Sequence, residues 1–220
     1  MTLPALALFG GTFDPVHQAH LSGARAVADA LGCPVRLLPN AVPPHRAQPL
    51  ATGEQRLAML QLACQGQPDL IPDDWELRQQ GPSWSLNTLH HFRTEIGPYR
   101  PLVLVIGADS FATLHKWHRW QDYPALCHLA VLPRPGAGSP TLEVAGAFHE
   151  NTPQGLLAAP AGCRLMLSEP WLDLSATGVR QDLARQGTST ALPAPVGAYI
   201  RTHRLYNVPP GSPLTDSGTA

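Results

Sequence analysis

The sequence predicts an α/β fold, a Rossmann-like doubly wound parallel sheet of about five or six strands with helices on both faces. Three observations support this prediction. Short apolar runs alternate along the chain with segments of helical periodicity, which is the order that βαβ units produce. The run at residues 102–106 is continuously apolar, as expected for a strand that helices cover on both faces. Glycine-containing segments follow two of the runs, at residues 10–11 and 107–108, which suits the edge where such sheets bind ligands.

The first half of the sheet is expected between residues 3 and 38. Residues 3–9 and 35–38 are apolar runs that predict two strands. The segment between them has one apolar helical face, and Gly32 with Pro34 supplies a helix stop. The residues of this face are Leu21, Ala24, Val27, Ala28 and Leu31. A strand, a helix and a strand in this order predict parallel strands joined by a right-handed crossover.

Further helices are predicted from capping signals. Residues 52–55 form a capping box at the start of a helix. The expected buried face of this helix consists of Leu57, Leu60, Ala63 and Cys64. Ser85 is the expected N-cap of a helix over residues 86–96. A closing helix is expected after Pro193 and Pro195.

The second half of the sheet is expected to contain the strand at residues 102–106 and two more, at residues 128–132 and 164–168. Residues 137–163 are rich in Gly, Ala and Pro and have no strong period. We expect them to form a variable surface excursion without a function, containing a short helix near residues 154–157.

The composition excludes several classes of protein. The 220 residues suffice for one α/β domain with a sizeable core, and we expect a single domain over residues 1–206 and a loose tail over residues 207–220. A formal net charge of -1 leaves no broad basic field for nucleic acid. No run reaches the roughly 18 apolar residues of a membrane span, and no signal-peptide pattern is present. The four scattered cysteines form no CxxC pattern, so we expect a cytoplasmic protein with reduced thiols, either a monomer or a homo-oligomer.

Residues 10–20 carry the strongest functional signal. Gly10 and Gly11 form a turn at the end of the first predicted strand, so the backbone can approach a ligand there without a Cβ in the way. The following helix offers unpaired N–H groups and the positive end of its dipole, which together favour phosphate. His17 and His20 are three residues apart and share one face of its first turn. No Lys-Ser or Lys-Thr pair follows the glycines, so this is not a Walker A loop.

A second phosphate-binding segment is predicted at another helix start. Ser175 and Thr177 carry hydroxyls there, and Arg180 can reach back past them because helical side chains lean toward the N-terminus. Asp109 follows the predicted central strand, which places it across the switch point from the first glycines. Trp117 lies in a loop beyond the same edge and is either core filler or a stacking platform.

Simpler interpretations of these residues are open. The two glycines can form only a turn, and the two histidines can be a solvated pair or half of a zinc site. The serines and the aspartate can be ordinary helix caps. His115 and His118 repeat the HxxH spacing, but Lys116 between them disfavours a cation site.

Residues 10–20 resemble the GTFDPxHxGH signature of the HxGH nucleotidylyltransferase superfamily, with Ala19 where the family usually has Gly. Other segments are similar to motifs of its bacterial nicotinate-mononucleotide adenylyltransferases. Residues 39–46 resemble their PNxxPPHK/R loop, and residues 134–136 match their RPG turn. Residues 175–180 resemble the SxTxxR motif, with Gly178 where an apolar residue is expected.

The resemblance implies transfer of the adenylyl group of ATP to nicotinate mononucleotide, forming deamido-NAD and pyrophosphate by direct in-line attack. The implied catalytic residues are His17, His20 and Arg180. The implied contacts to ATP and its phosphates are Gly10, Gly11, Thr12, Phe13, Gly107, Asp109, Arg134, Ser175 and Thr177. The implied contacts to the mononucleotide are Asn40, His45, Arg46, Ser85 and Trp117. Mg²⁺ is expected on the ATP phosphates, without a protein cage for the ion.

Alternative functions differ in the residues that they would require. The nearest alternative is an adenylyltransferase of the same superfamily with another acceptor, nicotinamide mononucleotide or pantetheine phosphate. Pantetheine-phosphate enzymes usually carry Thr at the first histidine, and cytidylyltransferases usually have an apolar residue where this chain has Pro15. A nucleotide-binding regulatory module would not need both histidines together with the Ser-Thr-Arg segment. A metal-dependent hydrolase built on the HxxH pairs is the third possibility.

Overall fold

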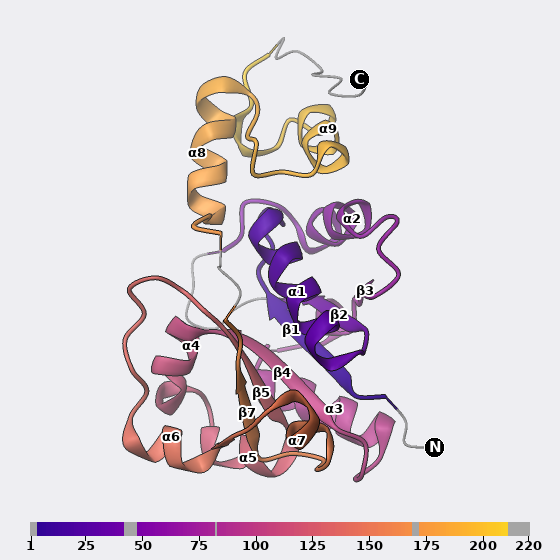
Figure 1. Ribbon diagram of the computed structural model, residues 1–220. Helices are drawn as coiled ribbons and strands as arrows, with labels where there is room; N and C mark the ends of the chain where they lie inside the picture. The colour runs from indigo at the N-terminus through magenta and orange to yellow at the C-terminus, as the bar shows by residue number, and fades with distance from the viewer. Residues whose placement is uncertain (1–3, 42–47, 82, 169–171, 211–220) are drawn as a thin grey trace.

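The computed structural model describes residues 4–41, 48–81, 83–168 and 172–210. Their wholly parallel, seven-stranded sheet has the order β3-β2-β1-β4-β5-β7-β6 (Figure 1). The strands are β1 Leu6–Gly11, β2 Val35–Pro39, β3 Leu70–Pro72, β4 Leu102–Gly107, β5 His128–Leu132, β6 His149–Glu150 and β7 Cys163–Met166. Because the order reverses between β1 and β4, the predicted Rossmann-like doubly wound sheet is confirmed.

Helices connect the strands and continue past the last of them. They are α1 Gln18–Leu31, α2 Gly53–Ala63, α3 Ser85–Ile96, α4 Ala108–Ala112, α5 Tyr123–Leu126, α6 Leu142–Ala147, α7 Pro153–Leu157, α8 Ala176–Gln186 and α9 Ala194–Thr202. Short 3-10 turns include η1 Glu76–Arg78 and η4 Leu205–Asn207. Within the described residues, no helix is long and apolar enough to cross a membrane.

The sheet has more strands than the five or six that were expected. β3 and β6 lie at its two edges and contain three and two residues. Segments this short carry no periodic apolar pattern, so pattern analysis cannot detect them. β7 also begins and ends earlier than the expected strand at residues 164–168.

Each face of the sheet has its own core, because side chains alternate along a strand. In β1, Ala7 and Phe9 pack on the face that α1, α2, α8 and α9 cover. Leu6 and Leu8 pack on the opposite face, where α3 lies. Figure 1 shows α9 beside α2, with α8 at the same end of the molecule. The closing helix predicted from Pro193 onward is therefore present, and it completes the first of the two cores.

The predicted helix signals are largely confirmed. All five apolar residues expected on the inner face of α1 are buried, and Gly32 ends the helix with a left-handed φ of 59°. In the capping box of α2, the Thr52 hydroxyl accepts from the Gln55 N–H at 3.2 Å. The buried face of α2 differs from the expected one, because Leu57 is only partly buried while Arg56 and Met59 are buried in addition.

The expected cap at Ser85 is wrong, and the alternative interpretation of Asp109 as a cap is not supported. The N-cap of α3 is Trp84, and Ser85 is the first helical residue. The Ser85 side chain instead bonds with the Tyr123 hydroxyl. The N-cap of α4 is Gly107, so Asp109 is not the cap of its helix and lies within the first turn.

The segment expected as a surface excursion is part of the core. It contains α6, β6 and α7, of which only the last was predicted. Val144, Phe148 and Leu156 in this segment have no exposed surface. The glycines and prolines had suggested a loop, but burial of these three side chains anchors the segment to the sheet.

Burial of these side chains should contribute to the stability of the protein. Phe148→Ala should lower the free energy of unfolding by about 3–5 kcal/mol, because it leaves a cavity in a closed core. Leu142→Ala is the matched control, since Leu142 belongs to the same segment and is 93% exposed. That variant should change stability by less than about 0.5 kcal/mol. Urea unfolding measures both, and equal effects would return residues 137–163 to the status of a surface excursion.

Candidate active site

A pocket of about 880 Å³ lies at the carboxyl ends of β1 and β4. This is the topological switch point of the sheet, where folds of this type bind ligands. Every described residue that was predicted to bind ATP or the mononucleotide, or to act in catalysis, lines this pocket. His45 and Arg46 were predicted to join them and lie outside the described residues.

The two glycines belong to the strand rather than to a turn. Gly10 and Gly11 are the last residues of β1 and pair with Leu38 and Pro39 of β2. A Cβ on Gly11 would lie 3.0 Å from the Phe13 ring. Glycine at position 11 was expected because it lets a ligand approach the backbone. It also leaves room for the Phe13 ring to pack against the end of the strand. Phe13 itself is buried and has a left-handed φ of 49°.

His17 and His20 form a stacked pair at the start of α1. His17 is the N-cap, and the ring centroids are 3.8 Å apart with an interplanar angle of 25°. The His17 backbone N–H donates to Nδ1 of His20 at 3.3 Å. A neutral His20 ring therefore carries its proton on Nε2, because Nδ1 is occupied as an acceptor.

Both imidazoles favour the neutral form. The pKa of His17 is lowered to about 4, mainly by burial and to a smaller extent by the positive charge of Arg134. Burial and the neighbouring His17 also hold the pKa of His20 well below its usual value. At neutral pH the pair therefore offers N–H donors rather than two positive charges.

The second predicted phosphate segment forms the start of α8. Ser175 is its N-cap, and its hydroxyl oxygen accepts from the Gly178 N–H at 3.1 Å. A Cβ on Gly178 would lie 3.4 Å from that oxygen, at the start of ordinary contact distances, so the structure does not explain glycine where an apolar residue was expected. Arg180 donates to the Thr177 hydroxyl at 3.2 Å and to the backbone oxygen of Asp14 at 2.7 Å. Arg180 thus connects α8 to the loop that precedes the histidines.

Asp14 lies at the centre of this connection, and it was not predicted as a site residue. Its carboxylate is 5% exposed and accepts from the backbone N–H groups of Leu50 and Ala51 at 2.9 and 3.1 Å. The Tyr206 hydroxyl donates to it at 2.8 Å, and Arg180 lies 3.9 Å from it. The family-like motif at residues 10–20 contained Asp14, but only the structure identifies its partners.

Arg56 is a second residue that pattern analysis missed. Its side chain is 1% exposed and donates to the backbone oxygens of Thr12 and Asn40, each at 2.8 Å. Burial lowers the pKa of Arg56, while Asp14 and Tyr206 oppose that shift. The sequence signal that could have identified Arg56 is its place in the predicted helix, beside positions expected to be buried. Arg56 fixes the loops after β1 and β2 relative to each other.

Asp109 and Arg134 form an ion pair across the switch point. Nη1 of Arg134 lies 3.2 Å from Oδ2 of Asp109, and both side chains are roughly half exposed. A Cβ on Gly107 would lie 2.6 Å from Oδ1 of Asp109. Glycine at this position therefore allows the carboxylate to fold over the end of β4. An exposed pair of this kind contributes little to stability, so both groups are available to a ligand.

Aromatic side chains line another part of the pocket. Trp117 is partly exposed and contacts Tyr123 edge to face, with centroids 6.0 Å apart. Trp84 and His118 stack at 4.9 Å and line the same pocket. This arrangement favours the platform interpretation of Trp117 over core filler, because its ring borders the pocket. Trp84 and His118 are additional lining residues that were not predicted.

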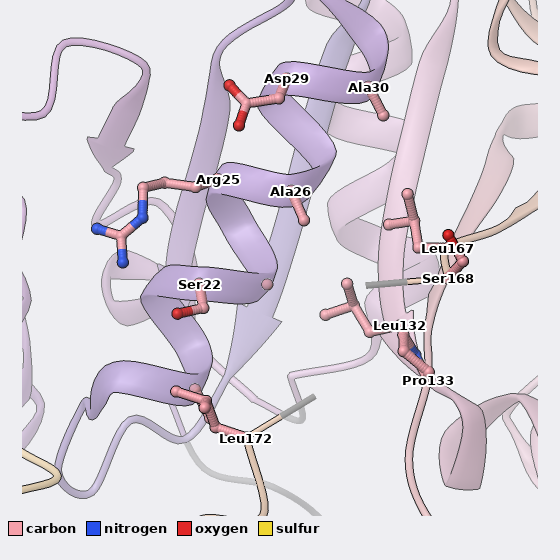
Figure 2. Close-up of a pocket in the computed structure, with 12 residues that line it drawn as sticks. Ser22, Arg25, Ala26, Asp29, Ala30, Leu132, Pro133, Leu167, Ser168 and Leu172 are labelled. Atoms are coloured by element: carbon pink, nitrogen blue, oxygen red, sulfur yellow. The ribbon is translucent and has the colours of Figure 1, made fainter. Parts of the chain in front are cut away.

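A smaller pocket of about 660 Å³ lies along α1. Figure 2 shows Ala26 and Ala30 of α1 on one side of it, and Leu132 and Leu167 on the other. Ala19, which precedes His20 in the first turn of α1, also lines it.

The chain is similar to known proteins. A model of the cytidylyltransferase-like family matches residues 8–182. A protein of Serratia proteamaculans (strain 568), named as a probable nicotinate-nucleotide adenylyltransferase, is 45% identical over 91% of this chain and 94% of its own length. A protein of Pectobacterium atrosepticum with the same name is 44% identical over 93% of this chain and its full length.

A solved structure has the same fold. The nicotinic acid mononucleotide adenylyltransferase of Plasmodium falciparum, complexed with NaAD, superposes with a TM-score of 0.71 over 94% of this chain and 99% of its own. At 13% sequence identity this likeness concerns the fold alone. The family match and the two bacterial relatives extend over the strands and helices that build the pocket. The chain therefore belongs to the cytidylyltransferase-like family and is a nucleotidyltransferase.

Proposed function

We propose that this nucleotidyltransferase transfers the adenylyl group of ATP to nicotinate mononucleotide, forming deamido-NAD and releasing pyrophosphate. The main support is the placement of two helix starts, those of α1 and α8, at one pocket. His17 and His20 lie at the first of them. Ser175, Thr177 and Arg180 lie at the second. Helix N-termini with such donors bind phosphate, and the names of the bacterial relatives support the choice of acceptor.

The pocket along α1 suits the adenine ring of ATP. Its wall opposite α1 is apolar and includes Leu132, Pro133 and Leu167. The facing side of α1 contributes the small residues Ala26 and Ala30 (Figure 2). A planar base packs well between such walls. Because Ala19 of this pocket directly precedes His20 in α1, a base held here would place its phosphates near the first turn of the helix.

The triphosphate then lies between α1 and α8, and the acceptor phosphate attacks the α-phosphorus in line. Such a transfer asks the protein mainly for positioning and for stabilisation of developing charge. The neutral rings of His17 and His20 can each donate one N–H, to the α-phosphate and to the bridging oxygen. Arg180 keeps its charge at any physiological pH, so it would stabilise the pyrophosphate as it leaves.

Mg²⁺ is proposed to enter with the nucleotide. Among the described residues, no three His, Cys, Asp or Glu side chains are grouped to hold a metal ion. A Mg²⁺ ion carried by phosphate oxygens and water fits such a donor set, and it would neutralise part of the phosphate charge. Positioning of the nucleotide remains the task of the two helix starts.

We propose that the acceptor binds in the larger pocket, beside Trp117 and Ser85. Trp117 offers an aromatic face for the nicotinate ring, and the start of α3 at Ser85 offers backbone N–H groups for its carboxylate. Asn40 lies at the end of β2, where its Oδ1 atom would be 3.6 Å from a Cβ on Gly10. Asn40 can therefore contact a ligand that lies across the glycines.

The histidines provide a direct test of catalysis. His20→Ala should lower kcat by about 100-fold or more, because a preorganised donor to the developing charge is lost. His17→Ala should act similarly. His90→Ala is the matched control, since His90 is exposed on α3, and should leave kcat unchanged. Pyrophosphate release measures all three, and near-normal turnover of the double variant at positions 17 and 20 would contradict the mechanism.

Nucleotide binding should be linked to proton uptake. In the free protein the pKa of His17 is about 4, against an ordinary value of 6.5. Bound phosphates favour imidazolium and raise this pKa, so between the two values the complex binds more protons than the free protein. Affinity for a non-cleavable ATP analogue should therefore rise as the pH falls through this window.

Titration calorimetry near pH 5.5, in two buffers of different ionisation enthalpy, measures the number of protons taken up. His17→Gln serves as the reference, because it removes the titrating group and keeps a polar side chain of similar reach. Identical proton uptake by the two proteins would show that the His17 ring does not meet the phosphates.

Acceptor preference tests the proposed function itself. A carboxamide in place of the nicotinate carboxylate would set its NH₂ group against backbone donors, which costs a charge-assisted bond and leaves a donor unpaired. kcat/KM should favour nicotinate mononucleotide over nicotinamide mononucleotide by at least about 100-fold. A coupled assay with ATP and a panel of acceptors that includes pantetheine phosphate measures this. Equal values for the two mononucleotides would indicate a dual-specificity enzyme, and use of pantetheine phosphate alone would replace the proposed acceptor.

A further inference from the structure

A buried carboxylate, that of Glu76, lies beside the acceptor end of the pocket and has no role in the function described above. Glu76 belongs to η1 and is 5% exposed. Its Oε2 atom accepts a hydrogen bond from the Ser83 hydroxyl, and its Oε1 atom accepts one from the Thr88 hydroxyl at 2.7 Å. A buried carboxylate needs such donors, and both come from the segment that begins α3.

The carboxylate is also close to the wall of the pocket. A Cβ on Gly10 would lie 4.0 Å from Oε1 of Glu76 and 3.6 Å from Oδ1 of Asn40. Ser83 lines the pocket, whereas Thr88 is buried on α3 and does not line it. Glu76 therefore connects the strand end at Gly10 with the turn at residues 83–85 that borders the pocket.

The direction of these hydrogen bonds limits what the turn can offer a ligand. An ionised carboxylate only accepts, so the Ser83 and Thr88 hydroxyls both point their protons at Glu76. The Tyr123 oxygen in turn engages the Ser85 side chain and the Leu86 N–H. As the first residue of α3, Ser85 carries one of the backbone N–H groups that have no partner within the helix. The turn thus presents a backbone donor to the pocket while its hydroxyl protons are directed elsewhere.

We propose that Glu76 is a positioning residue that holds the turn at residues 83–85 in the conformation that accepts a carboxylate-bearing acceptor. The carboxylate accepts the Ser83 hydroxyl proton and so holds the Ser83 side chain in place. This contact fixes the path of the backbone into α3. Glu76 thereby contributes to the preference for a carboxylate over a carboxamide without touching the substrate. This inference rests on the proposed function, because it assigns the acceptor's carboxylate to the start of α3.

Glu76→Gln and Ser83→Ala test the inference by steady-state kinetics of the full chain with ATP and both mononucleotides. The glutamine keeps the shape but brings an NH₂ donor, which opposes at least one of the two hydroxyls. For each variant, KM for nicotinate mononucleotide should rise about tenfold, while kcat and KM for ATP change by less than about threefold. The preference for nicotinate over nicotinamide mononucleotide should fall by a similar factor of about ten.

Thr88→Val is the matched control. It removes the other hydroxyl bond to Glu76 from a buried position on α3, and leaves Ser83 and Glu76 paired. This variant should keep the acceptor preference within about twofold of the unmodified protein, even where urea unfolding shows a loss of stability. Ser83→Thr retains the hydroxyl and should retain the preference.

An unchanged preference in both Glu76→Gln and Ser83→Ala would overturn the inference and leave Glu76 with a structural role only. The same holds if Thr88→Val reduces the preference as much as Ser83→Ala does. If Glu76→Gln does not fold, Ser83→Ala decides alone, because that truncation removes one hydroxyl from a half-buried side chain. Failure of the proposed function is recognised separately, since the unmodified protein would then not use nicotinate mononucleotide at all.

Discussion

The geometry of the site depends on the Asp14 carboxylate and the donors that surround it. A buried carboxylate is costly unless hydrogen bonds replace its water. Here the donors to the carboxylate come from the residues just before α2 and from η4. Arg180 of α8 adds its charge at 3.9 Å and donates to the Asp14 backbone oxygen. None of these segments is near Asp14 in sequence, so satisfying one side chain requires all of them to be in place. The loop before the histidines is therefore ordered by tertiary contacts and not by its own sequence.

Arg56 has the complementary role on the neighbouring loop. Its guanidinium donates to backbone oxygens at the ends of β1 and β2, which are otherwise difficult to satisfy away from water. A buried anion and a buried cation thus fix two adjacent loops at the switch point. This rigidity suits transfer chemistry, because donors that are already positioned need no reorganisation when charge develops. The neutral histidine pair acts within this frame, with its ring orientation set by the bond from the His17 N–H to His20.

Local patterns were sufficient for much of the fold and for the outline of the site. Apolar runs predicted the five main strands, and the helical period predicted the buried face of α1. The described candidate residues met at one pocket, because motifs that follow parallel strands converge at the same sheet edge. The misses are of a different kind. The bond of Arg56 to Thr12 and the partners of Asp14 join residues far apart in the chain. Ser85 failed as a cap because Tyr123, distant in sequence, engages its side chain.

The bond between Tyr206 and Asp14 joins residues 192 positions apart, and this separation affects the order in which the enzyme is completed. During synthesis the N-terminal strand and its glycines leave the ribosome first, and domains begin to fold as their segments emerge. All seven strands have been synthesised once β7 has appeared, while the loop at Asp14 still lacks two of its donors, Arg180 and Tyr206, and one core still lacks α8 and α9. Contacts of such long range form late, since chain closure must precede them. The active-site loop therefore cannot be completed until the last helices of the domain have been made.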